Sequence, residues 1–152
     1  MDRDLVINRK ARRDYNIIKT LEAGIVLLGS EVKSLKEGKG SLEGAFARIE
    51  NGEAFLYQMN ISPYEKAPTY ALRDPKTPRK LLLHKKEIGE LAGAISRLGR
   101  TIVPLKLYYR RGKIKVLLGI ASGKSQVDKR EKIKEQESQR EINRILKRRR
   151  EF

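Results

Sequence analysis

Two stretches of alternating apolar and polar residues restrict the fold of this sequence more than any other feature. The longer stretch begins near residue 102, and its first half places four side chains on one face: Val103, Leu105, Leu107 and Tyr109. Arg111-Gly112 follows, and apolar residues then recur at every second position from 114 to 120. A period of two is typical of a β-strand with one buried face. The pattern therefore predicts a hairpin that turns at Arg111-Gly112.

A second hairpin is predicted by its turn. Residues 46–49 and 54–57 are rich in apolar and aromatic side chains, and they flank Asn51-Gly52. Asn-Gly supplies the two positive φ angles that a type I′ turn requires. Residues 15–28, which Gly24 interrupts, and residues 79–83 have the composition of further strands. We therefore expect five or six strands, with a loop at residues 62–78, where four prolines occur.

One segment between the strands has helical periodicity. From His84 onward, apolar residues recur at positions i, i+3, i+4, i+7 and i+10: Ile88, Leu91, Ala92, Ile95 and Leu98. Gly99 is placed to end this helix. A shorter helix is expected from Ser30, as its N-cap, to Lys36. These elements predict a mainly β fold in which the strands form a small barrel, and the OB-fold is the commonest barrel of this kind that binds nucleic acid.

The charge of the chain indicates its partner. It carries 35 Lys and Arg against 19 Asp and Glu, a formal charge of +16 on 152 residues. A field this positive is best tolerated beside a polyanion, and it favours a monomer. The excess gathers at both ends, in residues 1–13 and 122–152. We expect a nucleic-acid-binding domain over residues 1–121, starting with a mobile basic arm at 1–13, and a basic tail at 122–152.

Several classes of protein are disfavoured by composition. The chain has no cysteine and one histidine, His84, so thiolate metal sites, disulfides and a histidine-based catalytic site have little support. It shows no Gly-rich phosphate loop, no apolar run long enough to cross a membrane and no signal peptide. The sequence therefore predicts a cytoplasmic binding protein that is no enzyme, needs no cofactor or metal, and does not contact a membrane.

The tail differs in composition from the rest of the chain. After Ala121 large apolar residues are too sparse to make a core, although oppositely charged residues recur three positions apart. Ordering such a backbone costs about 1–2 kcal/mol per residue. We therefore expect a tail that is largely disordered in free solution and becomes helical on a polyanion.

Five stretches of the sequence resemble one family. They are NRKARRDY at residues 8–15, EAGIVL at 22–27 with EVKSLKEGK at 31–39, ISPY at 61–64, RKLLLHK at 79–85, and GK at 123–124 with DKR at 128–130. Together they resemble the SmpB (small protein B) family from residue 8 to about 134. The resemblance implies a six-stranded OB-fold-like barrel with two or three helices. It also implies binding to the tRNA-like domain of transfer-messenger RNA and its delivery to the A site of stalled ribosomes for trans-translation. The tail would occupy the empty mRNA channel as a helix.

The resemblance also implies which residues contact RNA. The candidates in the barrel and its N-terminal segment are Asn8, Arg9, Lys10, Arg12, Arg13, Tyr15, Glu22, Lys33, Ser34, Lys36, Lys39, Asn60, Arg79, Lys80, Leu82 and His84. The candidates for ribosome contact in the tail are Lys124, Asp128, Lys129, Arg130, Lys132 and Lys134. From spacing alone, Glu22 is an ordinary strand-end carboxylate. Leu82 fits either an exposed side chain that packs on a base or a strand buried on both faces, and His84 either caps a helix or faces RNA.

The chain departs from the family pattern at three positions of the tail and at one position of the N-terminal segment. Ser122 and Ser125 stand where the family usually has lysine, Val127 where it has histidine or an aromatic residue, and Arg13 where histidine is usual. Three other interpretations stay open. The chain could be a generic ribosomal or rRNA-binding OB-fold protein, an RNA-modifying enzyme, or a charge-dense domain whose surface charges only stabilise it.

Overall fold

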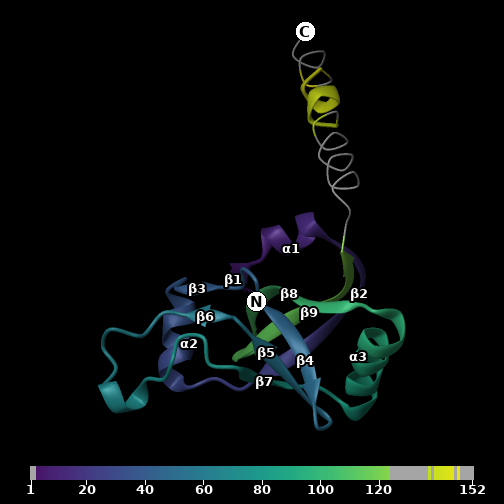
Figure 1. The fold of residues 1–152 in the computed structure, drawn as a ribbon. Helices are drawn as coiled ribbons and strands as arrows, with labels where there is room; N and C mark the ends of the chain where they lie inside the picture. The colour runs from purple at the N-terminus through teal and green to yellow at the C-terminus, as the bar shows by residue number, and fades with distance from the viewer. Residues whose placement is uncertain (1–2, 124–136, 138, 146, 148–152) are drawn as a thin grey trace. The chain divides into compact units, whose positions relative to one another are not determined.

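The computed structural model describes residues 3–123, 137, 139–145 and 147 (Figure 1). The chain divides into two units, Met1–Ser122 and Gly123–Phe152. In the second unit, residues 139–145 are helical and exposed, and Nε2 of Gln139 donates to Oδ1 of Asn143 at 3.1 Å. The six residues expected to contact the ribosome, 124, 128, 129, 130, 132 and 134, lie outside the described residues.

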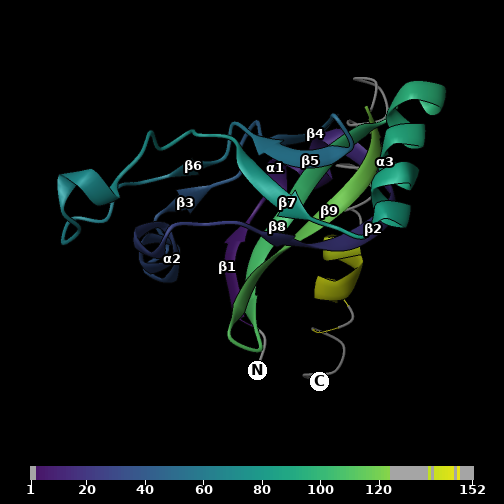
Figure 2. The same ribbon diagram turned by 90° about the horizontal axis from the view of Figure 1, so that it is seen from below.

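Six strands of the first unit close into a barrel, as the sequence predicts (Figures 1 and 2). Their order around the ring is β8, β4, β5, β7, β2 and β9, and β9 pairs with β8 to close it. The strands are β2 (Tyr15–Ile25), β4 (Phe46–Glu50), β5 (Glu53–Tyr57), β7 (Arg79–Leu82), β8 (Thr101–Arg110) and β9 (Lys113–Gly123). The predicted hairpin turn is present, because Asn51 and Gly52 both have positive φ, at 51° and 75°.

Helices and a small sheet lie on two sides of the barrel. Both views place α3 (Lys85–Leu98) on one side and α2 (Gly29–Lys36) on the other, with the two-stranded sheet of β3 (Gly40–Ser41) and β6 (Asn60–Ile61) (Figures 1 and 2). Leu91 of α3 and Leu35 of α2 are fully buried in the main core. The loop at 62–78 contains one short 3₁₀ helix, Thr69–Ala71. No helix in the described part of the chain is long and apolar enough to cross a membrane.

The long hairpin contains a bulge that the sequence does not reveal. The register of β8 with β9 shifts between Pro104 and Lys106. Leu107 therefore lies in the main core, whereas Val103 and Leu105 face a second cluster. The expectation that Val103, Leu105 and Leu107 share one face is wrong, because the extra residue reverses the alternation. On β9 the alternating residues from 114 to 120 do line the main core, as predicted.

The N-terminal segment is not a mobile arm, and that expectation is wrong for residues 3–13. Strand β1 (Arg3–Ile7) pairs with the second half of β8, and α1 (Arg9–Asp14) follows it. Asn8 joins the two, since its Nδ2 donates to the Pro104 carbonyl at 2.8 Å and its Oδ1 accepts from the Ala11 amide at 3.2 Å. A strand partner about a hundred residues away cannot be inferred from a local pattern.

Helix α2 begins differently from the prediction. Its N-cap is Leu28, one residue before Gly29, rather than Ser30. The Leu28 amide donates to Oε1 of Glu31 at 2.9 Å, which satisfies one free donor of the first turn. Ser30 instead donates through Oγ to the Ala71 carbonyl at 3.1 Å. Ser30 thus ties the helix to the loop at 62–78.

Candidate nucleic-acid interface

A hollow of about 330 Å³ opens between the end of β2, α2, β7 and the turn that joins β8 to β9. It is lined by Gly24, Ile25, Leu27, Val32, Lys36, Leu82, Tyr109, Gly112, Lys113, Ile114 and Lys115. The lining therefore combines apolar side chains with three lysines. Cations beside exposed apolar and aromatic groups suit a nucleic acid, because phosphate and base can be bound together.

Leu82 is the exposed apolar residue of this hollow. Its neighbour Leu81 is 2% exposed, whereas Leu82 is 53% exposed. Strand β7 pairs with β2 so that Leu82 lies opposite Gly24, and a Cβ at Gly24 would come within 3.1 Å of the Leu82 Cβ. Of the two interpretations of Leu82, the exposed side chain is correct and the strand buried on both faces is wrong.

Two lysines of α2 lie over aromatic rings, and one of them, Lys36, lines the hollow. Nζ of Lys36 lies 4.9 Å from the ring centre of Tyr109, and Nζ of Lys33 lies 5.6 Å from that of Tyr64. A cation over an aromatic face gains roughly 0.5–1 kcal/mol at an exposed site. Lys113 and Lys115 on β9 line the opposite side. Tyr109, Lys113 and Lys115 were not among the expected contact residues, although lysines flanking the predicted turn were an available signal.

Glu22 lies on β2 and is engaged by two side chains from β8. Its Oε2 accepts a hydrogen bond from the Tyr108 hydroxyl and another from Nη1 of Arg110 at 3.1 Å. The Tyr108 hydrogen bond, together with Arg110 and Lys115, holds the pKa of Glu22 below its usual value. An ionised Glu22 therefore orients Arg110, which is one way in which a carboxylate fits an otherwise basic surface.

Three residues expected to contact RNA are buried, which corrects that expectation. Asn8 is 5% exposed, Ser34 is fully buried and Arg79 is 1% exposed. Asn8 caps α1, and Arg79 is enclosed by polar partners from α2 and the loop at 62–78. A surface contact with RNA is not available to these side chains, because each already faces the protein interior.

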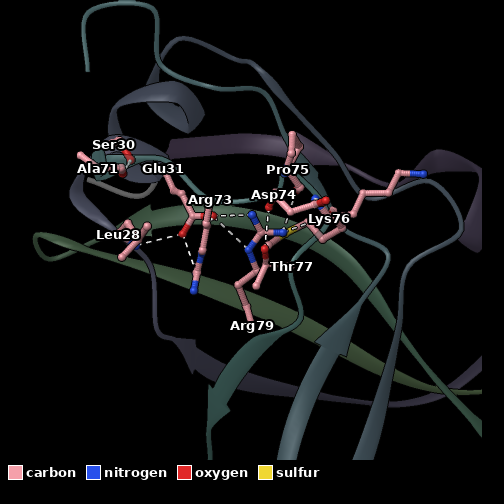
Figure 3. Close-up of polar contacts among 11 residues, drawn as sticks. Leu28, Ser30, Glu31, Ala71, Arg73, Asp74, Pro75, Lys76, Thr77 and Arg79 are labelled. Carbon is pink, nitrogen blue, oxygen red and sulfur yellow. Dashed lines mark hydrogen bonds and ion pairs between the residues drawn. The ribbon is translucent and has the colours of Figure 1, made fainter. Parts of the chain in front are cut away.

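Arg79 is the centre of a buried polar cluster (Figure 3). Its Nε donates to Oε2 of Glu31 at 3.1 Å, its Nη2 donates to the same oxygen, and its Nη1 donates to the carbonyls of Met59 at 2.8 Å and Pro75 at 2.9 Å. Arg73 binds the other oxygen of Glu31 at 2.6 Å. The cluster fixes α2, and with it Lys33 and the rim of the hollow, to β7 and the loop.

The charge of Glu31 is maintained in spite of its burial. Burial by itself raises the pKa of this carboxyl, but hydrogen bonds from Arg73, the Leu28 amide and Arg79 outweigh burial. The pKa of Glu31 therefore lies below its usual value. A buried ion pair with its remaining lone pairs satisfied is the arrangement that makes loss of one partner costly.

Helix α1 forms a second basic surface. Its exposed cations are Arg9, Lys10, Arg12 and Arg13. Lys10 pairs with Glu43 at 3.5 Å and Arg13 with Asp14 at 3.4 Å. Next to it is a depression of about 350 Å³ between α1 and residues 40–43. Tyr15 is half-buried against the second core cluster. Predicted contact residues thus lie both on α1 and in the hollow, and the depression beside α1 shares no lining residue with the hollow.

The remaining predicted residues are distributed around the barrel. Lys39 pairs with Glu37 at 3.3 Å, and the hydrogen bond that Lys39 donates to Glu37 raises the pKa of Lys39. Asn60 is half-buried on β6, and Lys80 is exposed on β7. His84 precedes α3 as its N-cap. Its amide donates to Glu87 at 3.0 Å while its ring is exposed. His84 is therefore the N-cap residue with an exposed ring, and contact of that ring with RNA stays a prediction. In the described part of the chain no cluster of three potential metal ligands occurs.

Comparison with known proteins gives a consistent result. The sequence model of the SmpB protein family matches residues 5–148. The SsrA-binding protein of Enterococcus faecalis is 55% identical over 140 residues, which cover 92% of this chain and 90% of the relative. That of Roseiflexus castenholzii is 50% identical over 149 residues, 98% of this chain and 94% of the relative. A solved structure described as "tmRNA-SmpB: a journey to the center of the bacterial ribosome" contains a chain that is 54% identical, with a TM-score of 0.66, and the match covers 79% of this chain and 84% of that one.

Proposed function

The chain belongs to the SmpB family, and on this premise we propose that it binds the tRNA-like domain of transfer-messenger RNA and delivers it to the A site of stalled ribosomes. The protein and its RNA together act in trans-translation, in which synthesis resumes on the reading frame of the RNA. The relatives named SsrA-binding protein and the structure of tmRNA-SmpB on the bacterial ribosome support this assignment.

The observation that carries the proposal on this chain itself is the hollow beside β7. Leu82 is exposed there, between the lysines of α2 and β9. Covering an exposed leucine with a ligand removes apolar surface from water, which favours binding. A nucleotide base at the elbow of a folded RNA covers it, while Lys36, Lys113 and Lys115 neutralise the surrounding phosphates.

In this proposal the protein acts by binding and carries out no reaction, so that the ribosome forms the new peptide bond. It works as a monomer in the cytoplasm, where stalled ribosomes occur. The tail enters the empty mRNA channel, with Lys124 and Lys129 among the cations that meet ribosomal RNA. The serine at 125 and the valine at 127 weaken this step, because neither offers a cation or a ring to a ribosomal base.

Ribosome rescue in a reconstituted translation system tests the proposal. Ribosomes are stalled on an mRNA without a stop codon, and transfer-messenger RNA is added with or without the protein. The full chain is expected to cause tagging of the nascent peptide. A chain that ends after Gly123, and so keeps all of β9, is expected to bind the RNA but to lose tagging. Absence of tagging with the full chain would overturn the proposal.

A generic rRNA-binding OB-fold protein is the alternative, and the same system distinguishes it. Such a protein binds ribosomes at low salt but does not cause addition of a tag. The pair of substitutions Ser125→Lys and Val127→His then tests the tail. We expect them to increase the rate of tagging, and an unchanged rate would show that these two positions do not limit rescue.

A further inference from the structure

The outer face of the β4–β5 hairpin carries a group of aromatic and cationic side chains that the proposed function does not use. Phe46 and Tyr57 lie opposite each other in the register of β4 and β5. Their ring centres are 5.7 Å apart with an angle of 12° between the ring planes, so the rings are stacked. Both side chains are half-buried, and they lie on the face opposite to the buried Ala47 and Leu56.

Arg48 completes this group. Its guanidinium lies 5.7 Å from the ring centre of Phe46 and 5.6 Å from that of Tyr57, and the residue is exposed. A guanidinium close to two rings is restricted in its motion, and Arg48 is exposed, so the group is accessible from solvent. Bases stack on aromatic rings and on guanidinium planes alike.

The neighbouring strand extends the same face. Phe55 pairs with Lys80 across β5 and β7, so Arg48, Phe55 and Lys80 form one row across three strands. Glu50 and Glu53 lie at the hairpin turn, where Glu50 accepts from the Tyr57 hydroxyl at 2.6 Å and Glu53 lies 3.6 Å from Lys80. The carboxylates repel phosphate at the turn, so a nucleic-acid backbone passes Arg48 and reaches Lys80 by replacing Glu53 in that exposed pair.

We propose that Phe46, Arg48 and Tyr57 form a stacking platform for an unpaired base of a bound RNA, with Lys80 beside it for the adjoining phosphate. This site is distinct from the hollow beside Leu82, because it lies on the outer face of β4 and β5, and neither strand lines the hollow. A base-paired helix hides the faces of its bases, so the platform selects single-stranded nucleotides over a duplex. The proposal requires an RNA ligand but not the tRNA-like domain.

A packing role alone would produce the same stacked pair, since cross-strand aromatic pairs contribute roughly 0.2–1 kcal/mol to a sheet. Binding of a fluorescein-labelled oligoadenylate of about eight nucleotides to the full chain separates the two roles. Tyr57→Leu removes the ring and is expected to lower the affinity about tenfold. Tyr57→Phe keeps the ring and is expected to leave the affinity unchanged. An RNA duplex of the same length is expected to bind both variants like the parent.

Salt dependence gives a readout that a loss of packing does not alter. Tyr57→Leu is expected to leave the slope of log K against log salt unchanged, because no phosphate contact is lost.

Arg48→Gln is compared with Arg97→Gln, which removes the same charge from an exposed position in the last turn of α3. We expect a loss of about tenfold from Arg48→Gln and a much smaller one from Arg97→Gln.

Equal affinity of Tyr57→Leu and the parent, or equal losses from the two arginine variants, would overturn the proposal. If Tyr57→Leu reduces the melting temperature strongly, the arginine pair still decides, because both side chains are exposed. Failure of the platform proposal would leave the proposed function standing, because binding of the tRNA-like domain at the hollow is tested separately with Leu82→Ala.

Discussion

Arg79 and Glu31 form an ion pair inside the first unit, and Nε of Arg79 lies 3.1 Å from Oε2 of Glu31. Their side chains are 0% and 8% exposed. The pair joins β7 to α2, two elements that border the hollow. The geometry of the candidate interface therefore depends on two charges that no ligand can reach.

Glu31→Gln is expected to destabilise the protein strongly. It leaves the guanidinium of Arg79 buried without its counter-charge, which costs about 3–5 kcal/mol of unfolding free energy. Urea denaturation at pH 7 measures this loss. Glu43→Gln is the matched control, because Glu43 pairs with Lys10 on the surface, where a pair is worth about 0–1 kcal/mol. Similar losses in the two variants would contradict the structural role given to Glu31.

The same carboxylate makes stability depend on pH. The pKa of Glu31 is lowered from its usual value of 4.5 in the folded chain. Its contribution is therefore fully present above pH 4.5 and is lost as the pH falls through the lower, folded pKa. Urea midpoints measured from pH 7 to about pH 3 are expected to converge for the parent and Glu31→Gln at the acidic end. A difference that stays constant with pH would show that Glu31 is not the group that titrates.

Leu81 and Leu82 give a matched pair of substitutions on β7. Leu82→Ala is expected to change stability by less than about 1 kcal/mol but to lower the affinity for the tRNA-like fragment roughly five- to tenfold. Leu81→Ala removes a buried side chain and is expected to cost about 2–5 kcal/mol of stability. Denaturation and filter binding give the two quantities. A Leu82→Ala variant that binds the fragment as well as the parent would remove Leu82 from the interface.

Tyr108→Phe tests how Glu22 is held. The substitution keeps the ring and removes the hydroxyl that donates to Glu22. Because that hydrogen bond is the largest cause of its lowered pKa, we expect the Glu22 pKa to rise toward 4.5, while Arg110 still holds it below that value. NMR titration of the carboxyl carbon measures the change. Unaltered titration would mean that Arg110 and Lys115 set the charge of Glu22 without Tyr108.

Features predicted correctly from the sequence depend on residues close together in the chain. The Asn51-Gly52 turn, the amphipathic helix that ends at Leu98 and the alternation from 114 to 120 each have a local cause. Features predicted wrongly depend on distant partners. In the sequence RKLLL, Arg79 looks like a surface cation, because nothing nearby in the chain shows that it has a buried partner. That partner, Glu31, is 48 residues away. Likewise, β1 is a strand because it pairs with β8, about a hundred residues later in the chain.

The candidate interface was predicted only in part, because some of its residues come together through pairing of distant strands. Lys36 and Leu82 were expected and do line one hollow, whereas Tyr109, Lys113 and Lys115 reach it only because β8 and β9 close the barrel beside β2. Asn8 and Ser34 were assigned to the RNA interface through the resemblance, in which they belong to basic segments. Their burial comes from contacts with distant parts of the chain, since Asn8 donates to the Leu42 and Pro104 carbonyls and Ser34 lies on the buried face of α2.

Competition binding at fixed salt tests the central claim most directly. The labelled tRNA-like domain of transfer-messenger RNA is bound to the full chain, and unlabelled ordinary tRNA is added as competitor, with titrations repeated over about 50–200 mM salt. Recognition of a folded RNA predicts that ordinary tRNA displaces the domain only at a large excess, and that this preference persists as salt weakens both complexes. Equal affinity for the two RNAs at every salt concentration would contradict the account, because charge alone would then explain the binding.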